Sequence, residues 1–307
     1  MESARVESRL AVAVARRHYL AGESKVDIAT SLGISRFKVA RLLERAQAEG
    51  SVRIQVIDPH ESDDPLAERV REAYGLRECR VISSDLPEAL LADELGAAGA
   101  RVLAGCVAGA DTLGLPWSRM VHRVVESLEG LPPVPVVQLC GSLVLPGEES
   151  AVDLVRHAAR VTRGSAHVFH APLIMPTAEG ADAIRSQPDV RGALAAAERV
   201  TVAVCSIGAW GAGTSTIYDA VSETDRAAVT EAGAVAETMG LFFDASGAVV
   251  RPDLGDRIVT VSPDRLRAVP TVVALSRGPE RAEATRAVLR SGVVDRVVLD
   301  SALAEAL

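Results

Sequence analysis

The sequence predicts an α/β protein with a small all-α head and a larger domain built on a parallel sheet. From Pro65 onward, apolar strand-like runs alternate with helical stretches, whereas residues 1–50 show only helical periodicity. Aromatic residues make up 3% of the 307-residue chain, so Ala, Val and Leu must fill the core, as in helices packed on a Val-rich parallel sheet. The length fits two domains, which we place at residues 1–57 and 58–307.

The charge differs in sign between these two parts. Residues 1–57 hold ten basic and six acidic residues, a net charge of +4. The whole chain holds 33 basic and 41 acidic residues, so residues 58–307 hold 23 and 35, a net charge of −12. A basic head on an acidic body indicates that the head binds nucleic acid without help from the body.

Composition also excludes several classes of chemistry and location. The chain has two lysines, Lys25 and Lys38, so a Schiff base in the large domain is excluded. Its four cysteines are scattered without a CxxC pair, which indicates reduced, buried thiols rather than disulfides or a zinc site. No signal peptide is visible and the longest apolar run, residues 102–110, is too short for a membrane span. We therefore expect a cytoplasmic protein with no membrane partner.

Three helices are predicted in the head, over residues 6–19, 25–32 and 36–49. Ser24 and Ser35 stand where N-caps belong, and Gly33 ends the second helix in a left-handed turn. In the second helix Ile28 and Leu32 are expected to be buried. In the third, an apolar stripe of Val39, Leu42, Leu43 and Ala46 is expected to face the core.

The opposite face of the third helix is basic, and the pair of short helices forms a helix-turn-helix pattern. Its N-terminal residues would meet base edges in the major groove of double-stranded DNA. Residues 51–57 alternate as a strand that could form a wing. The alternative is a small helical bundle with a solvated basic face. The predicted DNA-contacting residues are Lys25, Ser35, Arg36, Phe37, Lys38 and Arg41.

The larger domain is predicted to contain eight strands and at least six helices. Ligands bind such folds beyond the carboxyl ends of the strands. The strands are expected over residues 80–83, 112–115, 134–139, 166–169, 201–207, 240–243, 271–275 and 296–299. The helices are expected over residues 90–105, 118–129, 151–163, 190–199, 224–232 and 279–291.

Both parts resemble the SorC (sorbitol-operon regulator) family. The head carries IATSLGISRFKVARLLERAQAEGSVRIQVIDP, with alanine at position 40 where the family usually has serine. The large domain carries GLPWSRMVHRVVESL, VVQLCGSL, APLIMP and GAVAETMGLFFDASG, so the resemblance covers nearly its full length. It implies a Rossmann-like domain of the glucosamine-6-phosphate-deaminase-like superfamily. It also implies an operator as partner, a sugar or sugar-phosphate effector, and a homo-oligomer, dimer or tetramer, formed through this domain.

The resemblance also places the effector site. By this resemblance, Ser118 and Arg119 would surround a phosphate, and Arg281 stands where the family has a phosphate-binding lysine. Glu237 matches a family aspartate that would accept a hydrogen bond from a ligand hydroxyl. Met120, Ser118 and Glu237 depart from the family pattern, which leaves open an unusual effector or a lost phosphosugar site. The predicted effector-binding residues are Trp117, Ser118, Arg119, Gly141, His170, Glu237, Ser276, Arg277, Gly278 and Arg281.

Other signals predict neither a cofactor nor a metal. The glycine-rich residues 208–213 lack the GxGxxG spacing and are interpreted as a loop at the rim of the pocket. His167 and His170 would point to opposite faces of a strand and could not share a metal. The sequence favours a regulator. The alternatives are an isomerase- or deaminase-like enzyme acting on a sugar phosphate, and a regulator whose effector is not phosphorylated.

Overall fold

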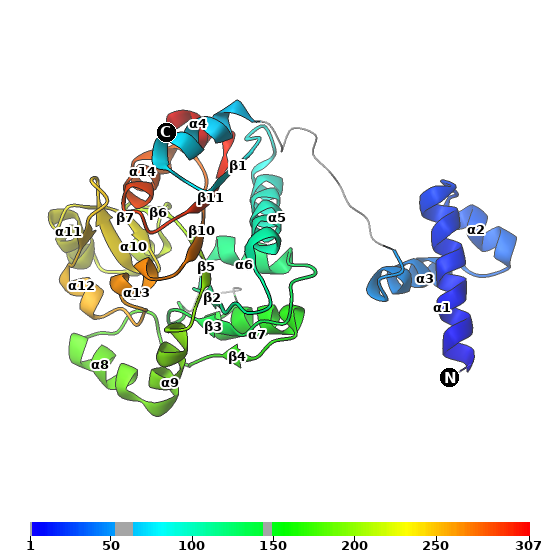
Figure 1. Ribbon diagram of the computed structural model, residues 1–307, viewed down its shortest axis with the longest axis horizontal. Coiled ribbons are helices and arrows are strands. Elements are labelled where there is room, and N and C mark those ends of the chain that lie inside the picture. Colours follow the sequence, from blue (N-terminus) through cyan, green and yellow to red (C-terminus); the bar gives the residue numbers. More distant parts are fainter. Residues whose placement is uncertain (1, 53–63, 144–148) are drawn as a thin grey trace. The chain divides into compact units, whose positions relative to one another are not determined.

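The computed structural model describes residues 2–52, 64–143 and 149–307, and the chain divides into two compact units, Met1–Pro59 and His60–Leu307. The first unit contains α1 (Glu2–Ala15), which continues as the π-helical turn η1 (Arg16–Leu20), then α2 (Lys25–Leu32) and α3 (Arg36–Ala48) (Figure 1). The three predicted helices are therefore present.

Local signals in the sequence set the ends of α2 and α3. The Ser24 and Ser35 hydroxyls accept hydrogen bonds from the amides of Asp27 and Lys38, each at 3.2 Å, and Gly33 has φ of +62°. Leu32, which the sequence placed in the core, is 38% exposed, because the covered part of α2 ends one turn earlier at Ile28 and Ala29. The expected strand over 51–57 falls outside the described residues, apart from Ser51 and Val52, which form no strand.

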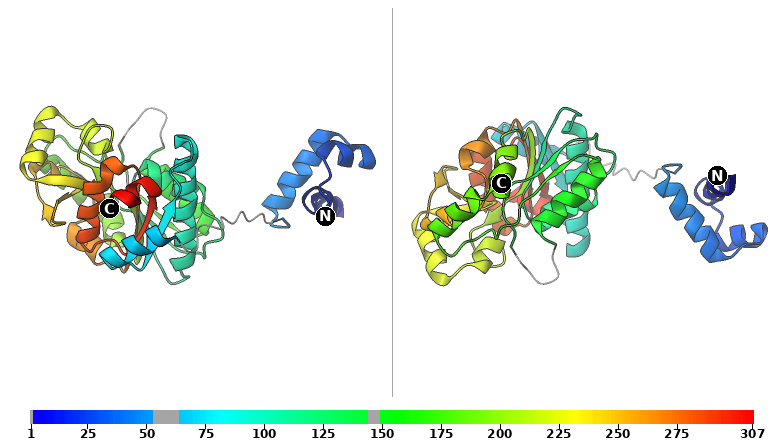
Figure 2. Two further views of the ribbon diagram at one scale, coloured as in Figure 1. Left: turned by 90° about the horizontal axis from the view of Figure 1, so that it is seen from above. Right: turned by 90° about the horizontal axis from the view of Figure 1, so that it is seen from below.

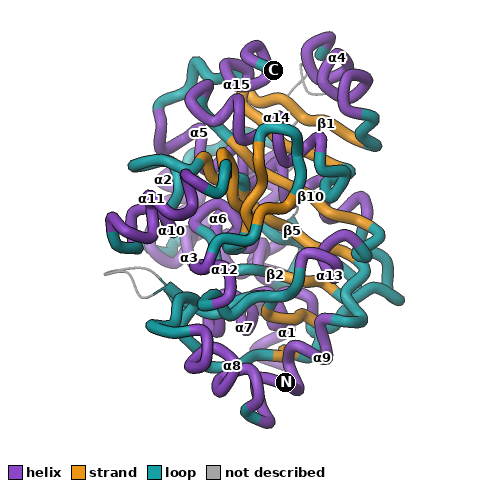
Figure 3. The backbone as a smooth tube through the Cα atoms, turned by 90° about the vertical axis from the view of Figure 1, so that its left-hand side faces the viewer, coloured by secondary structure: helices purple, strands orange, loops and turns teal. Residues whose placement is uncertain are grey.

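The second unit is built on a seven-stranded sheet in which every neighbouring pair is parallel, as the sequence predicts (Figure 3). Its order is β1 (Glu78–Ile82), β11 (Arg296–Asp300), β10 (Thr271–Ser276), β5 (Val202–Ser206), β2 (Leu113–Leu115), β3 (Val136–Gln138) and β4 (Ala166–His167).

Helices cover both faces of this sheet, which confirms the predicted α/β class (Figures 1 and 2). Val202 and Val204 of β5 pack toward the first set of helices, and Ala203 and Cys205 pack toward the second. The first set is α5 (Glu88–Cys106), α6 (Arg119–Glu126) and α7 (Ala151–Thr162); the second is α4 (Pro65–Tyr74), α9 (Pro188–Ala197), α14 (Ala282–Arg290) and α15 (Ser301–Ala306).

One predicted strand of the parallel sheet belongs elsewhere. Residues 240–243 overlap β8, which lies in a separate antiparallel sheet of β6 (Gly208–Ala209), β7 (Ala234–Thr238), β8 (Leu241–Asp244) and β9 (Val249–Val250). The cause is a tight turn: Met239 and Gly240 have φ of +53° and +80°, so β8 folds straight back onto β7. A hairpin of this kind can only pair antiparallel strands.

The remaining helices are short and surround the sheets. They are α8 (Ala178–Ser186), α10 (Thr216–Ala220), α11 (Glu223–Glu231), α12 (Asp253–Asp256), α13 (Pro263–Arg267) and the 3-10 turn η2 (Pro279–Arg281), which replaces the start of the helix expected over 279–291. Across the described part of the chain, no helix combines the length and apolarity needed to cross a membrane.

Candidate functional site

A cavity of about 270 Å³ lies at the carboxyl ends of β2, β5 and β10, three adjacent strands of the parallel sheet. The strand order reverses between β2 and β5, which is where α/β sheets open to a ligand. The wall of the cavity is mostly polar. It includes Ser118, Arg119, Arg123, Ser206, Gly208, Gly213, Thr214, Ser215, Asp219, Glu237, Ser276, Arg277 and Arg281.

Serines mark the end of each of these three strands. Ser118 follows β2 and caps α6, where its hydroxyl accepts from the amides of Met120 at 3.2 Å and Val121 at 3.4 Å. The same hydroxyl lies 2.7 Å from the hydroxyl of Ser206, the last residue of β5. Ser276 ends β10 and lies 3.0 Å from the hydroxyl of Thr285. The floor of the cavity is therefore a row of hydroxyl groups, which suits a ligand that carries hydroxyls.

A buried carboxyl group, that of Glu237 on β7, forms part of the wall. Glu237 is 8% exposed; it accepts from the Ser215 hydroxyl at 3.0 Å and from the Gly240 amide at 3.3 Å. Burial raises the pKa of Glu237, and these two hydrogen bonds only partly oppose the rise. The opposing residue on β6 is Gly208, where a Cβ atom would lie 2.5 Å from the carboxyl oxygen. The absence of a side chain at Gly208 thus gives the Glu237 carboxyl group the space that it occupies.

Arginines outnumber the acids on the wall. Arg123 pairs with Asp93 at 3.2 Å, and Arg277 pairs with Glu88 at 3.1 Å. Opposing the four arginines are the carboxyl groups of Asp219 and Glu237, of which the second is shifted toward its neutral form. Since Arg123 and Arg277 are already paired with carboxylates beyond the wall, the cavity suits a strongly polar ligand, and an anion would compete with those carboxylates.

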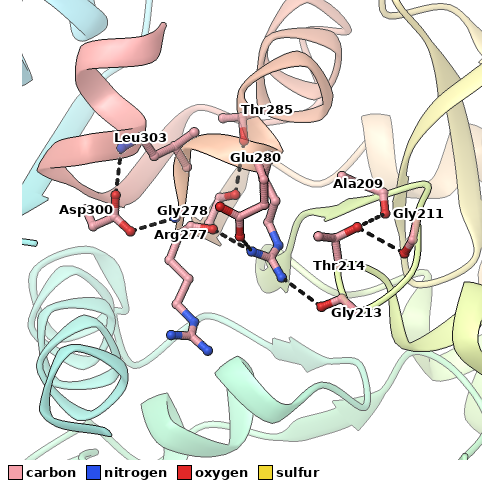
Figure 4. A network of polar contacts seen from close by, with 12 residues as sticks. Ala209, Gly211, Gly213, Thr214, Arg277, Gly278, Glu280, Thr285, Asp300 and Leu303 are labelled. Atoms are coloured by element: carbon pink, nitrogen blue, oxygen red, sulfur yellow. Dashed lines mark hydrogen bonds and ion pairs between the residues drawn. The ribbon is translucent and has the colours of Figure 1, made fainter. Parts of the chain in front are cut away.

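Arg281 connects two loops at the cavity, those of Arg277 and Gly213, which are labelled in Figure 4. Its Nη1 donates to the carbonyl of Arg277 at 2.8 Å and pairs with the Glu280 carboxylate, and its Nη2 donates to the carbonyl of Gly213 at 3.4 Å. Burial lowers the pKa of Arg281, but an arginine keeps its charge at neutral pH. Gly213 belongs to the glycine-rich segment that the sequence placed at the rim of the pocket, and both Gly208 and Gly213 lie on the cavity wall.

Six of the ten predicted effector residues come together on this wall. These are Ser118, Arg119, Glu237, Ser276, Arg277 and Arg281. Gly278 lies in the turn after β10, and its amide donates to Asp300 at 2.6 Å. Trp117 lines an adjoining cavity of about 400 Å³, where its indole donates to the carbonyl of Glu149 at 2.9 Å.

Two predicted residues are not brought to the cavity. Gly141 follows β3 and packs so closely on the backbone of Pro172 that a Cβ atom would lie 2.5 Å from its carbonyl oxygen. His170 is exposed and follows β4, the edge strand, which is separated from β5 by β2 and β3. Within the described ranges, no group of three or more His, Cys, Asp or Glu side chains is arranged to hold a metal ion.

Several residues of the wall were not predicted from the sequence, among them Ser206, Ser215 and Asp219. Ser206 carried a usable signal, because it is a polar residue at the carboxyl end of a predicted strand. Ser215 and Asp219 had none, since they reach the cavity from α10 and the residue before it.

In the first unit, α3 has one buried and one exposed face. Val39, Leu42, Leu43 and Ala46 form the predicted buried stripe. The predicted DNA-contacting residues are all exposed: Lys25, Ser35, Arg36, Phe37, Lys38 and Arg41.

The side chain of Arg45, further along the basic face, instead forms ion pairs within the first unit. It pairs with Glu7 of α1 and with Glu49, each at 2.6 Å, and so fastens α3 to α1. The exposed basic side chains of Arg36, Lys38 and Arg41 lie toward the N-terminus of α3, as in helices that read the major groove.

Comparison with known proteins agrees with this architecture. The family model described as "Putative sugar-binding domain" (Sugar-bind) matches residues 58–307. The chain is 24% identical over 307 residues to the deoxyribonucleoside regulator of Bacillus subtilis (strain 168), covering 99% of this chain and 98% of that protein. It is 27% identical over 308 residues to the transcriptional regulator LsrR of Enterobacter sp. (strain 638), covering 98% and 93%.

A solved structure shares the fold over nearly the whole chain. The full-length sorbitol operon regulator SorC from Klebsiella pneumoniae has a TM-score of 0.77 at 22% identity, and the match covers 97% of each chain. The chain therefore belongs to the Sugar-bind family, and its membership of the SorC family, predicted from its sequence, is confirmed.

Proposed function

We propose that this chain is a DNA-binding transcriptional regulator of carbohydrate-metabolism genes, and that a small sugar-type effector controls it. The observation that carries the proposal is α3: a capped helix with an exposed N-terminal turn of Arg36, Phe37 and Lys38 and a buried apolar stripe on its other face. A solvated bundle has no need of this arrangement, whereas a recognition helix requires it. We expect a regulator that binds operator DNA in this way to act in the cytoplasm.

The effector is proposed to bind in the 270 Å³ cavity of the second unit. Hydroxyl groups of Ser118 and Ser206 would meet sugar hydroxyls, while Arg119 and Arg281 would hold a phosphate by charge-assisted hydrogen bonds. The names of the relatives refer to a deoxyribonucleoside and to a sorbitol operon, which supports a small polyhydroxylated metabolite. A neutral polyol is the competing effector class.

Those relatives are regulators rather than enzymes, and we assign no catalytic activity to the chain. The described residues of the cavity wall include no His, Lys or Cys. We further propose a homo-oligomer, a dimer or a tetramer, because one head offers few base contacts and a second raises the effective concentration. Light scattering that finds a strict monomer in the presence of operator would contradict this part.

The test of the regulator is selection of DNA by the full-length protein from a random duplex library, followed by gel-shift titration of the enriched site. We expect a partly palindromic site whose halves lie about one helical turn apart, or a multiple of it. A fragment of residues 58–307 is the control: it should lose DNA binding and keep effector binding, because the chain divides into two compact units near that point. Failure to enrich any site would refute the proposal.

The effector is sought by a thermal-shift screen of phosphorylated sugars and their neutral counterparts. A ligand that binds only the folded state raises the melting temperature with its concentration. If a neutral sugar stabilises the protein more than its phosphate ester does, the assignment of a phosphate to Arg119 and Arg281 is wrong.

A further inference from the structure

The turn between β10 and α14 already holds an anion of the protein's own, the Glu280 carboxylate. This carboxylate pairs with the Arg281 guanidinium (Figure 4). It also folds back over the start of the turn, since a Cβ atom at position 278 would collide with both of its oxygens. Glu280 therefore occupies the Nη1 side of the Arg281 guanidinium, and a ligand anion that paired with Nη1 would have to displace it.

The backbone of the same turn offers little to a ligand. The Gly278 amide donates to the Asp300 carboxylate at 2.6 Å, Pro279 has no N–H, and the Arg281 amide donates to the Gly278 carbonyl at 3.0 Å. Of the three amide N–H groups in residues 278–281, two are thus already used, so an anion bound at this turn depends mainly on side chains such as that of Arg281.

The two carboxylates of this region differ in how readily they could leave. Asp300 is 2% exposed, and its second oxygen accepts from the Leu303 amide at 2.7 Å, which caps α15. Glu280 has a side chain that is 51% exposed. An exposed carboxylate regains its hydration when it swings away, and a ligand anion in its place would keep Arg281, whose side chain is only 16% exposed, in an ion pair. Asp300 is a fixed part of the turn, and Glu280 is a replaceable one.

We propose that Glu280 is a resident counter-ion of Arg281 that competes with the anionic group of the effector. The competition lowers the affinity for anions and so raises the effector concentration to which the protein responds. A neutral ligand that forms hydrogen bonds only with the serine hydroxyls of the cavity floor does not compete with Glu280 for Arg281. The inference rests on the proposed effector site and adds to it a residue that tunes its response.

The test is isothermal titration of the full-length protein with inorganic phosphate and with glucose 6-phosphate. Glu280→Gln should bind both about tenfold more tightly than the unaltered protein, and Glu280→Ala should show the same gain. Glu283→Gln is the matched control: it removes the same charge from an exposed glutamate in the first turn of α14, and should change affinity less than twofold.

A double-mutant cycle with Arg281 ties the effect to its proposed cause. In an Arg281→Ala background, Glu280→Gln should no longer improve phosphate binding, because the competition takes place at Arg281. Equal gains for Glu280→Gln and Glu283→Gln, or a gain that survives the loss of Arg281, would overturn the inference by showing a general charge effect.

Failure of the inference can be told apart from failure of the site. If Arg281→Ala abolishes phosphate binding while Glu280→Gln leaves it unchanged, the anion site stands and the competition is refuted. If neither substitution at these two positions changes binding, or no variant binds phosphate, both the competition and the proposed anion site are refuted. Circular dichroism of each variant checks that the fold is kept.

Discussion

The hydroxyl of Ser118 lies 2.7 Å from the hydroxyl of Ser206. Ser118 caps α6 after β2, and Ser206 ends β5, so the contact joins two strands at the place where the order of the parallel sheet reverses. Both hydroxyls face the cavity, yet only that of Ser118 also satisfies helix amides. The two serines therefore share a place in the cavity and differ in their structural task.

Ser118→Ala should lower the free energy of unfolding by about 1 kcal/mol, because the cap of α6 is lost. Ser206→Ala, its matched control, removes the other hydroxyl of the pair and leaves α6 capped. Urea denaturation compares the two variants, and titration with the effector found by screening should show weaker binding in both. Equal losses of stability would mean that the cap of α6 contributes nothing of its own.

Glu237 should make the protein less stable as the pH rises. Burial raises the pKa of its carboxyl group above the ordinary value of 4.5, so between that value and the folded-state pKa the folded protein holds more protons than the unfolded chain. Stability from this group is complete below about pH 4.5, the unfolded value, and declines as the pH rises through the folded pKa.

Glu237→Gln, which imitates the neutral acid, should remove this decline. The measurement is urea denaturation of both proteins at intervals between pH 5 and 8, and the unaltered protein should lose more stability than the variant across that range. Asp219→Asn is the control, since Asp219 lines the same cavity but is exposed. Parallel curves for the unaltered protein and Glu237→Gln would contradict a raised pKa of the Glu237 carboxyl.

Lys38→Ala should weaken operator binding and reduce its dependence on salt. Lys38 is exposed in the first turn of α3, where a side chain can reach a phosphate of the DNA backbone. Loss of one phosphate contact lowers the slope of log affinity against log salt by about one. Arg160→Ala is the control, because it removes an exposed charge on α7 in the second unit. A slope that is unchanged in Lys38→Ala would place this residue outside the interface.

The four cysteines are expected to react slowly with Ellman's reagent in the folded protein. All four are free, and burial raises the pKa of Cys79 and Cys140 to about 12 and that of Cys106 and Cys205 to about 11. The reactive thiolate is therefore scarce at pH 8. Unfolding in guanidinium should make four thiols react rapidly. Rapid reaction of the folded protein would show that these side chains are accessible. Cys106 would be the first residue to test by substitution, because it is only half-buried.

What the sequence could predict was decided by groups close together in the chain. Ser24 and Ser35 begin α2 and α3 through hydrogen bonds to amides three residues further on, and Gly33 ends α2 with a positive φ. The alternation of apolar runs with helical stretches indicated the α/β class. The carboxyl end of a parallel strand is also a local property. Ser118 and Ser276 were assigned to the site by the resemblance to the SorC family, and both line the cavity near the ends of strands.

The tertiary structure decided what depends on partners far apart in the chain. Residues 240–243 are as apolar as the parallel strands, and only the turn at Met239 and Gly240 sends them to the antiparallel sheet. His170 follows β4 and Ser206 ends β5, but β4 lies at the edge of the sheet and β5 near its centre, and no pattern along the chain records strand order. The contact of Arg281 with Gly213, 68 residues away, is likewise a product of packing alone.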